Sequence, residues 1–143
     1  MHTSFLTAVT TLAASVAAAP HVARQTVYAT WPATNVVDDI AHILVGLSFD
    51  ITSPAGYVAG APAFDVACSN TLLDQGPTAC TFNGPQAAGS SVEALYNTNG
   101  TVTVTHTFKT SSGGTTKVWG NSPYLGDSYN EDFAVEATYL QSS

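Results

Sequence analysis

A strict alternation of side chains over Thr101–Lys109 constrains the fold of this chain more than any other feature. The segment reads TVTVTHTFK, so threonines take one side and the other side takes Val102, Val104, His106 and Phe108. A period of two residues is typical of a β-strand with one buried face. The segment therefore predicts a strand that places His106 on its apolar, core-facing side.

Turn residues on both sides extend this segment into a meander. Asn97–Gly100 joins it to an alternating run at Ser91–Tyr96. Because Asn and Gly accept a positive φ, this connection is typical of a β-hairpin. Ser111–Gly114 then leads into Thr115–Trp119, which has the same character. We therefore expect three antiparallel strands that are neighbours both in the sequence and in space.

The remainder of the chain also favours strands. Further runs rich in β-forming residues occupy, in chain order, 26–31, 64–68, 79–82 and 132–140. Pro32 is expected to end the first run, and alternation in the last run puts Tyr139 on the same side as Val135. Roughly seven or eight short strands with frequent turns predict an all-β fold, a single-domain antiparallel β-sandwich or small β-barrel.

One stretch, 36–51, fits two patterns. Its first half carries an apolar stripe at helical spacing, and its second half alternates as a strand does. We expect a loop or a single helical turn as far as His42, followed by a strand from Ile43 to Ile51.

Charge excludes one broad class of function. Only 9% of the residues are charged, and the net charge is −7 with three Lys and Arg residues in all. A nucleic-acid-binding protein needs cations to displace the counterions of the phosphate backbone, so we expect no nucleic-acid partner.

The first residues predict export. Residues 1–19 are interpreted as a secretory signal peptide, because Phe5–Ala19 is apolar and uncharged and ends in small residues. Arg24 followed by Gln25 is a candidate monobasic processing point, so 20–24 is interpreted as a short propeptide and 25–143 as the mature domain. No other apolar run approaches the ~20 residues of a membrane span. We expect a secreted, extracellular protein without a membrane partner.

Two further features fit an exported chain. Cys68 and Cys80 are its two cysteines, and an even number in a secreted protein favours one disulfide, with two free buried thiols as the alternative. Asn99 begins the sequon Asn-Gly-Thr, which makes it a candidate glycosylation site. The alternative is an unoccupied sequon that serves only as a turn.

Catalytic signatures are weak. The sequence has no Gly-x-Ser-x-Gly elbow, and His42 and His106 are the plausible bases of the mature domain. We interpret His106 as a core residue. Asp38, Asp39 and His42 could hold a cation but are better explained as a solvated loop.

Acidic residues offer the other route to catalysis, since a glycosidase needs two carboxylates across a cleft. The candidates near strands are Glu93, Glu131, Asp132 and Glu136. Isolated acids on outer faces and at strand entries ordinarily serve solubility. We therefore expect no catalytic residue, no metal and no cofactor.

Aromatic residues at strand ends and in loops are the best candidates for binding. Those we single out are Tyr57, Trp119 and Tyr124. Exposed rings on a β-fold can stack on sugars or hold a small apolar ligand. The alternative is that these rings simply close the core.

A longer pattern runs through the chain. An Ala-Pro signal end and an Arg-Gln junction precede LSFDI at 47–51 and FDVAC at 64–68, and Cys80, a GTVTV strand and FAV at 133–135 follow. In this order the sequence resembles the small secreted fungal proteins of the Alternaria major-allergen family, which includes hypersensitive-response elicitors. Cys68 and Cys80 match the first intrachain cysteine pair of that pattern.

The resemblance implies an antiparallel β-barrel or sandwich, secretion by a filamentous fungus, and a non-enzymatic role as an allergen, elicitor or effector. The partner it implies is a host plant protein or a small apolar or phenolic ligand. The second cysteine pair of the pattern has no counterpart here, so we expect no covalent dimer. The functions set against this one are a small secreted hydrolase of cell-wall polysaccharide and a structural protein of the cell wall or spore surface.

Overall fold

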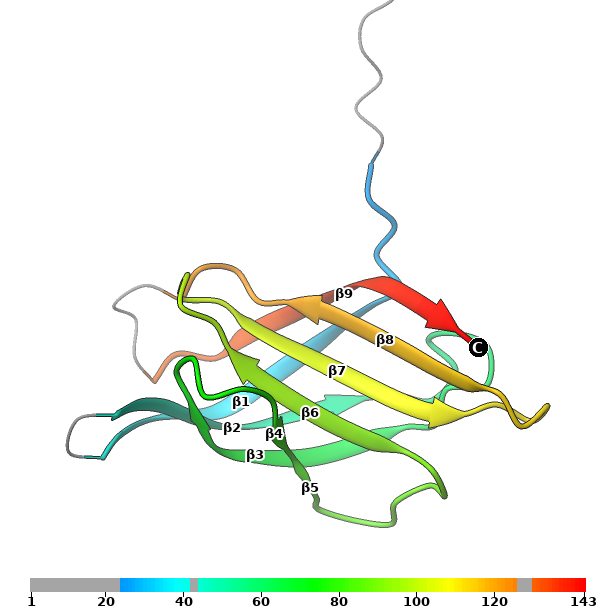
Figure 1. The fold of residues 1–143 in the computed structure, drawn as a ribbon, viewed down its shortest axis with the longest axis horizontal. Coiled ribbons are helices and arrows are strands. Elements are labelled where there is room, and N and C mark those ends of the chain that lie inside the picture. The colour runs from blue at the N-terminus through cyan, green and yellow to red at the C-terminus, as the bar shows by residue number, and fades with distance from the viewer. Residues whose placement is uncertain (1–23, 42–43, 126–129) are drawn as a thin grey trace, which may run out of the picture.

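The fold consists of strands alone in the part of the chain that is described, which is residues 24–41, 44–125 and 130–143 of a computed structural model. These residues form nine strands (Figure 1). They are β1 (Ala29–Ala41), β2 (Leu44–Ser53), β3 (Phe64–Leu72), β4 (Thr78–Ala79), β5 (Thr81–Phe82), β6 (Ser91–Tyr96), β7 (Val102–Lys109), β8 (Thr115–Asn121) and β9 (Phe133–Ser142). The expected all-β class is therefore confirmed.

All strands belong to one antiparallel sheet that nearly closes on itself. Its order is β4-β6-β7-β8-β9-β1-β2-β3-β5. In Figure 1 the strands β6, β7 and β8 lie in front of β1, β2 and β3, and β9 joins the two layers along the top. The architecture is a flattened barrel, which lies between the two forms that the sequence left open.

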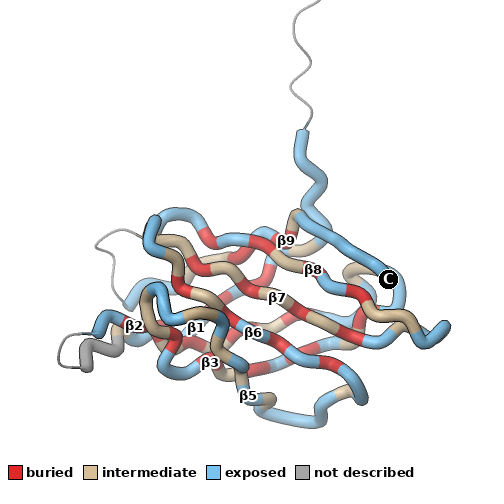
Figure 2. The backbone as a smooth tube through the Cα atoms, viewed as in Figure 1, coloured by how far each residue is buried: buried red, intermediate tan, exposed pale blue. Residues whose placement is uncertain are grey.

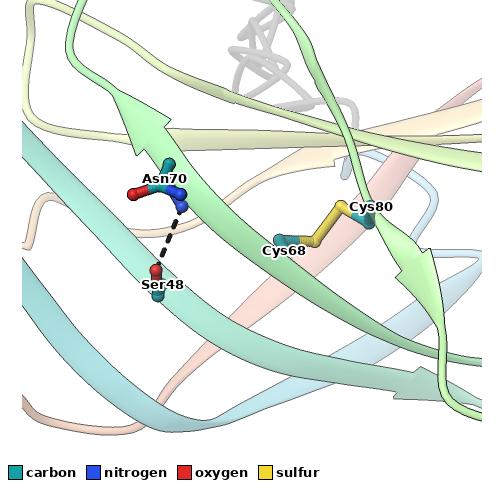
Figure 3. Close-up of a disulfide and its surroundings, with 4 residues drawn as sticks. All are labelled: Ser48, Cys68, Asn70 and Cys80. Carbon is teal, nitrogen blue, oxygen red and sulfur yellow. Dashed lines mark hydrogen bonds between the residues drawn. A yellow bond between two sulfur atoms is a disulfide. The ribbon is translucent and has the colours of Figure 1, made fainter.

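A short crossing segment closes the remaining seam between β3 and β6. β4 pairs with β6 and β5 pairs with β3, so residues 78–82 pass from one edge of the sheet to the other. Between them, the Cys80 amide donates to Val92 O on β6, and its sulfur bonds to Cys68 on β3 (Figure 3). The expected intrachain disulfide is confirmed. It bonds the crossing segment to β3 at the seam where the barrel closes.

The core fills the inside of the barrel. Alternate residues along β6, β7 and β8 are buried and solvent-facing (Figure 2). The largest fully buried apolar side chains are Trp31, Phe108, Ile51, Val66, Val92, Val102, Val104, Val118 and Val135. The three-stranded meander over 91–119 is confirmed, because local alternation and turn chemistry agree with the final fold.

Strand β1 departs from the expectation. It runs through Pro32, which pairs with Ala134 next to the last pair of the β1–β9 ladder, so the proline costs the ladder little. It also continues to Ala41, where we expected a loop or a helical turn. Asn35 has a positive φ of 53° and lies in a bulge between Thr34 and Val37. The bulge interrupts the alternation of period two, so the sequence pattern does not indicate a strand over this segment. His42 and Ile43 lie outside the described residues.

A second bulge corrects the expected side of Tyr139. Trp119 pairs with Tyr139, but Gly120 pairs with Ala137, so β9 holds one extra residue at this point. Ala137 is fully buried, and the extra residue turns Tyr139 to the outside, where it is 44% exposed. Gly120 makes this possible, because a Cβ atom there would lie 1.9 Å from the Glu136 carbonyl oxygen.

Candidate functional site

The outer surface of β8 and β9 carries a pair of stacked aromatic rings. Trp119 and Tyr139 are cross-strand partners, and their ring centroids are 5.3 Å apart with 10° between the planes. Their neighbours Val118 and Ala137 point into the core and are fully buried. The rings therefore stand on the solvent side of the barrel, where the β8–β9 bulge brings them together.

Two polar hollows flank this pair along the strands. The larger, of about 410 Å³, is lined by Asn121, Ser122, Pro123, Ala134 and Glu136. The smaller, of about 120 Å³, is lined by Thr115, Lys117, Gln141 and Ser143. We call the stacked pair and the two hollows the β8–β9 face. Its hydrogen-bonding groups are hydroxyls, amides, a carboxylate and an ammonium group, and they lie on both sides of an aromatic centre.

A hydrogen-bond chain orients the amide at one end of this face. Thr103 Oγ1 on β7 donates to Asn121 Oδ1 at 2.6 Å. Asn97 Nδ2 in turn donates to Thr103 Oγ1 at 2.8 Å. The Asn121 carbonyl oxygen is held toward β7, so its amide nitrogen is turned the other way. An oriented donor at the edge of a hollow favours a ligand that carries acceptor oxygens.

Tyr57 occupies a different position from the other two candidate aromatics. It is half-buried at the end of the barrel, and its ring meets that of fully buried Trp31 edge to face at 5.6 Å. Its hydroxyl lies 2.6 Å from His106 Nδ1. The opposite ring nitrogen, Nε2, lies 2.8 Å from the Ser90 hydroxyl. The structure thus joins three distant residues into a Tyr57–His106–Ser90 network, and no local sequence pattern could have indicated it.

Burial sets the protonation of this network. It lowers the pKa of His106 to about 4, so the imidazole is neutral above that pH. It also raises the pKa of the Tyr57 hydroxyl, which therefore keeps its proton. A neutral imidazole has one donor and one acceptor nitrogen. Because a phenol is a stronger acid than an alcohol, Tyr57 is the better donor to Nδ1. Nε2–H then donates to Ser90.

The network resembles a serine nucleophile with its histidine base in connectivity only. His106 is fully buried, and Ser90 is 3% exposed. With Nε2 as the donor, the imidazole does not take a proton from the serine hydroxyl. We therefore assign the network to the stability of the core, in agreement with the interpretation of His106 made from the strand pattern.

Tyr124 and Asn99 lie together at the tip of the β6–β7 hairpin. Tyr124 is 71% exposed, and its ring covers Gly100 so closely that a Cβ atom there would lie 2.4 Å from it. Asn99 is exposed, and its side-chain oxygen accepts from the Thr101 hydroxyl at 2.8 Å. The candidate glycosylation site is therefore accessible, and it neighbours Tyr124 and not the β8–β9 face.

The acidic candidates are separated over the surface. Glu93, Glu131, Asp132 and Glu136 are all exposed, and of these Glu136 lines a hollow of the β8–β9 face. Glu131 and Asp132 line a separate hollow beside Tyr124. In the described part of the chain, no group of three His, Cys, Asp or Glu residues is placed to hold a metal ion. Asp38 lies on β1, and its suggested partner His42 is outside the described residues.

Comparison with other proteins gives no independent guide to function. No family model, curated protein or solved structure matches this chain. Among the described residues, no helix has the length and apolar character needed to cross a membrane. A disulfide at the barrel seam is compatible with an extracellular protein.

Proposed function

We propose that this chain is a secreted fungal binding protein of the elicitor, effector or allergen type, and that it acts on its host without catalysis. The observation that carries the proposal is the Trp119–Tyr139 stack on the outer surface, with Trp119 half-buried and Tyr139 exposed, between two hollows that carry hydrogen-bonding side chains. Large aromatic side chains dominate the energy of most binding interfaces. A stack that lies outside the core contributes little to the packing of the barrel, and binding gives it a role.

The state of the candidate base supports a role other than catalysis. His106 lies in the core with both ring nitrogens engaged by Tyr57 and Ser90. A general base must come within hydrogen-bond reach of the proton that it removes from a substrate. Neither a substrate nor water reaches this imidazole without opening the barrel.

The apolar run at 1–19 and the disulfide support export, and the resemblance described above supports a fungal source and a plant host. The partner that the resemblance favours is a host protein or a small apolar or phenolic ligand. Either would meet the protein at the β8–β9 face.

The test is an assay of host response with purified mature protein, residues 25–143. We expect the response to survive Glu93→Gln, because Glu93 is exposed on β6 and lines neither hollow of the β8–β9 face, and to be lost in Trp119→Ala. His42→Ala tests the other candidate base, and we expect it to keep the response too. Tyr124→Ala is the matched control, since it removes an exposed aromatic residue that lines neither hollow of that face. Circular dichroism must show that each variant is folded. Loss of the response in folded Glu93→Gln would instead support a hydrolase.

A further inference from the structure

The β8–β9 face has a chemistry that narrows the class of its ligand. Its apolar side chains are the two rings together with Pro123 and Ala134, and every other side chain that lines the two hollows carries a hydrogen-bonding group. The core of a protein–protein interface is instead depleted of charged groups and rich in apolar area. A sugar unit combines an apolar C–H face with hydroxyls around its edge, and that combination matches a ring pair framed by polar groups.

The layout of the face favours a chain of sugars over a single sugar. Lys117 and Asn121 belong to the two hollows and are four positions apart on β8, which is about 13 Å at the rise of a strand. The stacked rings lie midway between them. A ligand that fills both hollows and crosses the rings must be extended, as β-linked glycan chains are.

The charge of the protein favours a neutral glycan over an acidic one. The protein has a net charge of −7, and the larger hollow contains Glu136. Acidic polysaccharides rich in uronates would be repelled by this field, whereas a neutral glycan would not.

We propose that the β8–β9 face binds a neutral, extended, β-linked glycan, with the C–H face of one sugar unit packed against an outer face of the Trp119–Tyr139 stack. This inference rests on the proposed function, because it keeps non-catalytic binding at the same face, and it names a glycan as the ligand in place of a host protein or a phenolic compound. Asn121, Lys117 and Gln141 then hydrogen-bond the hydroxyls of the units on either side.

The tryptophans provide a direct readout. The chain has two, and Trp31 is fully buried, so a ligand on the surface changes the emission of Trp119 alone. Mature protein is titrated with cello-oligosaccharides, N-acetylated chito-oligosaccharides and oligogalacturonates. The first two arms separate a plant-type from a fungal-type source, and the third tests the effect of charge. We expect saturable quenching by one of the neutral series and none by the uronates.

Two variants test whether the glycan binds at the β8–β9 face. Tyr139→Ala removes half of the stack and keeps the reporter, and its affinity should fall by about tenfold or more. Tyr124→Ala should bind as wild type does. If neither neutral series quenches the Trp119 emission, or if folded Tyr139→Ala binds with wild-type affinity, the glycan inference is wrong.

If neither series quenches the emission but Trp119→Ala still loses the host response, the proposed function stands and a host protein becomes the ligand. If Trp119→Ala also keeps the wild-type host response, the proposed function is wrong as well.

Discussion

Acid should destabilise this protein through one buried residue, His106. Its pKa is lowered to about 4 from an ordinary value of 6.5, because burial disfavours the charged ring. Between these two pH values the unfolded chain binds a proton at this residue and the folded chain does not. The contribution of the neutral ring is therefore complete above pH 6.5 and is lost as the pH falls toward 4.

The size of the effect follows from the shift. A difference of one unit of pKa corresponds to about 1.4 kcal/mol, so this shift amounts to about 3 kcal/mol of unfolding free energy. A single domain is stable by only about 5–15 kcal/mol, so the loss is a large share of the total. The His106 contribution should level off below pH 4, once the folded state is protonated too.

Urea denaturation between pH 7 and pH 4 measures this dependence. In His106→Gln the protein should be less stable at pH 7, because Tyr57 and Ser90 lose their partner, and its stability should depend much less on pH between 6.5 and 4. If His106→Gln does not fold, NMR titration of the native imidazole replaces it. If that imidazole titrates near pH 6.5 in the folded protein, burial does not lower its pKa and the predicted acid destabilisation through His106 is wrong.

Further predictions concern the seam, the bulge and the sequon. Replacing Cys68 and Cys80 together by Ala should lower the free energy of unfolding by about 3 kcal/mol in urea denaturation, because the bridge closes a short loop; an unchanged midpoint would show that the seam holds without it. Gly120→Ala should cost more than about 2 kcal/mol in the same assay, because its Cβ would overlap a backbone carbonyl of β9, and Gly84→Ala, with open space at its Cβ, should cost little. In a secreted preparation, Asn99→Gln should abolish any mobility shift caused by endoglycosidase; a shift that persists would place the glycan elsewhere.

The sequence predicted the parts of the fold whose causes are local. The meander over 91–119 was found because alternation and Asn-Gly chemistry act within a few residues of one another. Strand β1 was partly missed because Asn35 shifts its period, and Tyr139 was placed on the wrong side because of the bulge at Gly120. A bulge depends on how two strands pair, so the sequence of one strand does not reveal it.

The candidate site was predictable only in part. Trp119 stood out as a large residue near a strand end, but its stacking partner Tyr139 lies on another strand and was expected on the same side as Val135. The buried network joins residues 49 and 16 positions apart in sequence, Tyr57 to His106 and Ser90 to His106. The pairing of β6 with β7 brings Ser90 close to His106. Tyr57 reaches His106 from the segment between β2 and β3 only once the fold is complete, so Tyr57 was taken for an exposed residue.

We have proposed that the protein binds its host through the β8–β9 face. The most direct measurement is equilibrium depletion of labelled protein by immobilised host apoplastic and cell-wall material, in parallel for wild type, Trp119→Ala and Tyr124→Ala. Trp119→Ala should bind at least about tenfold more weakly, while Tyr124→Ala should bind as wild type does. Equal retention of wild type and folded Trp119→Ala, or a loss confined to Tyr124→Ala, would contradict it.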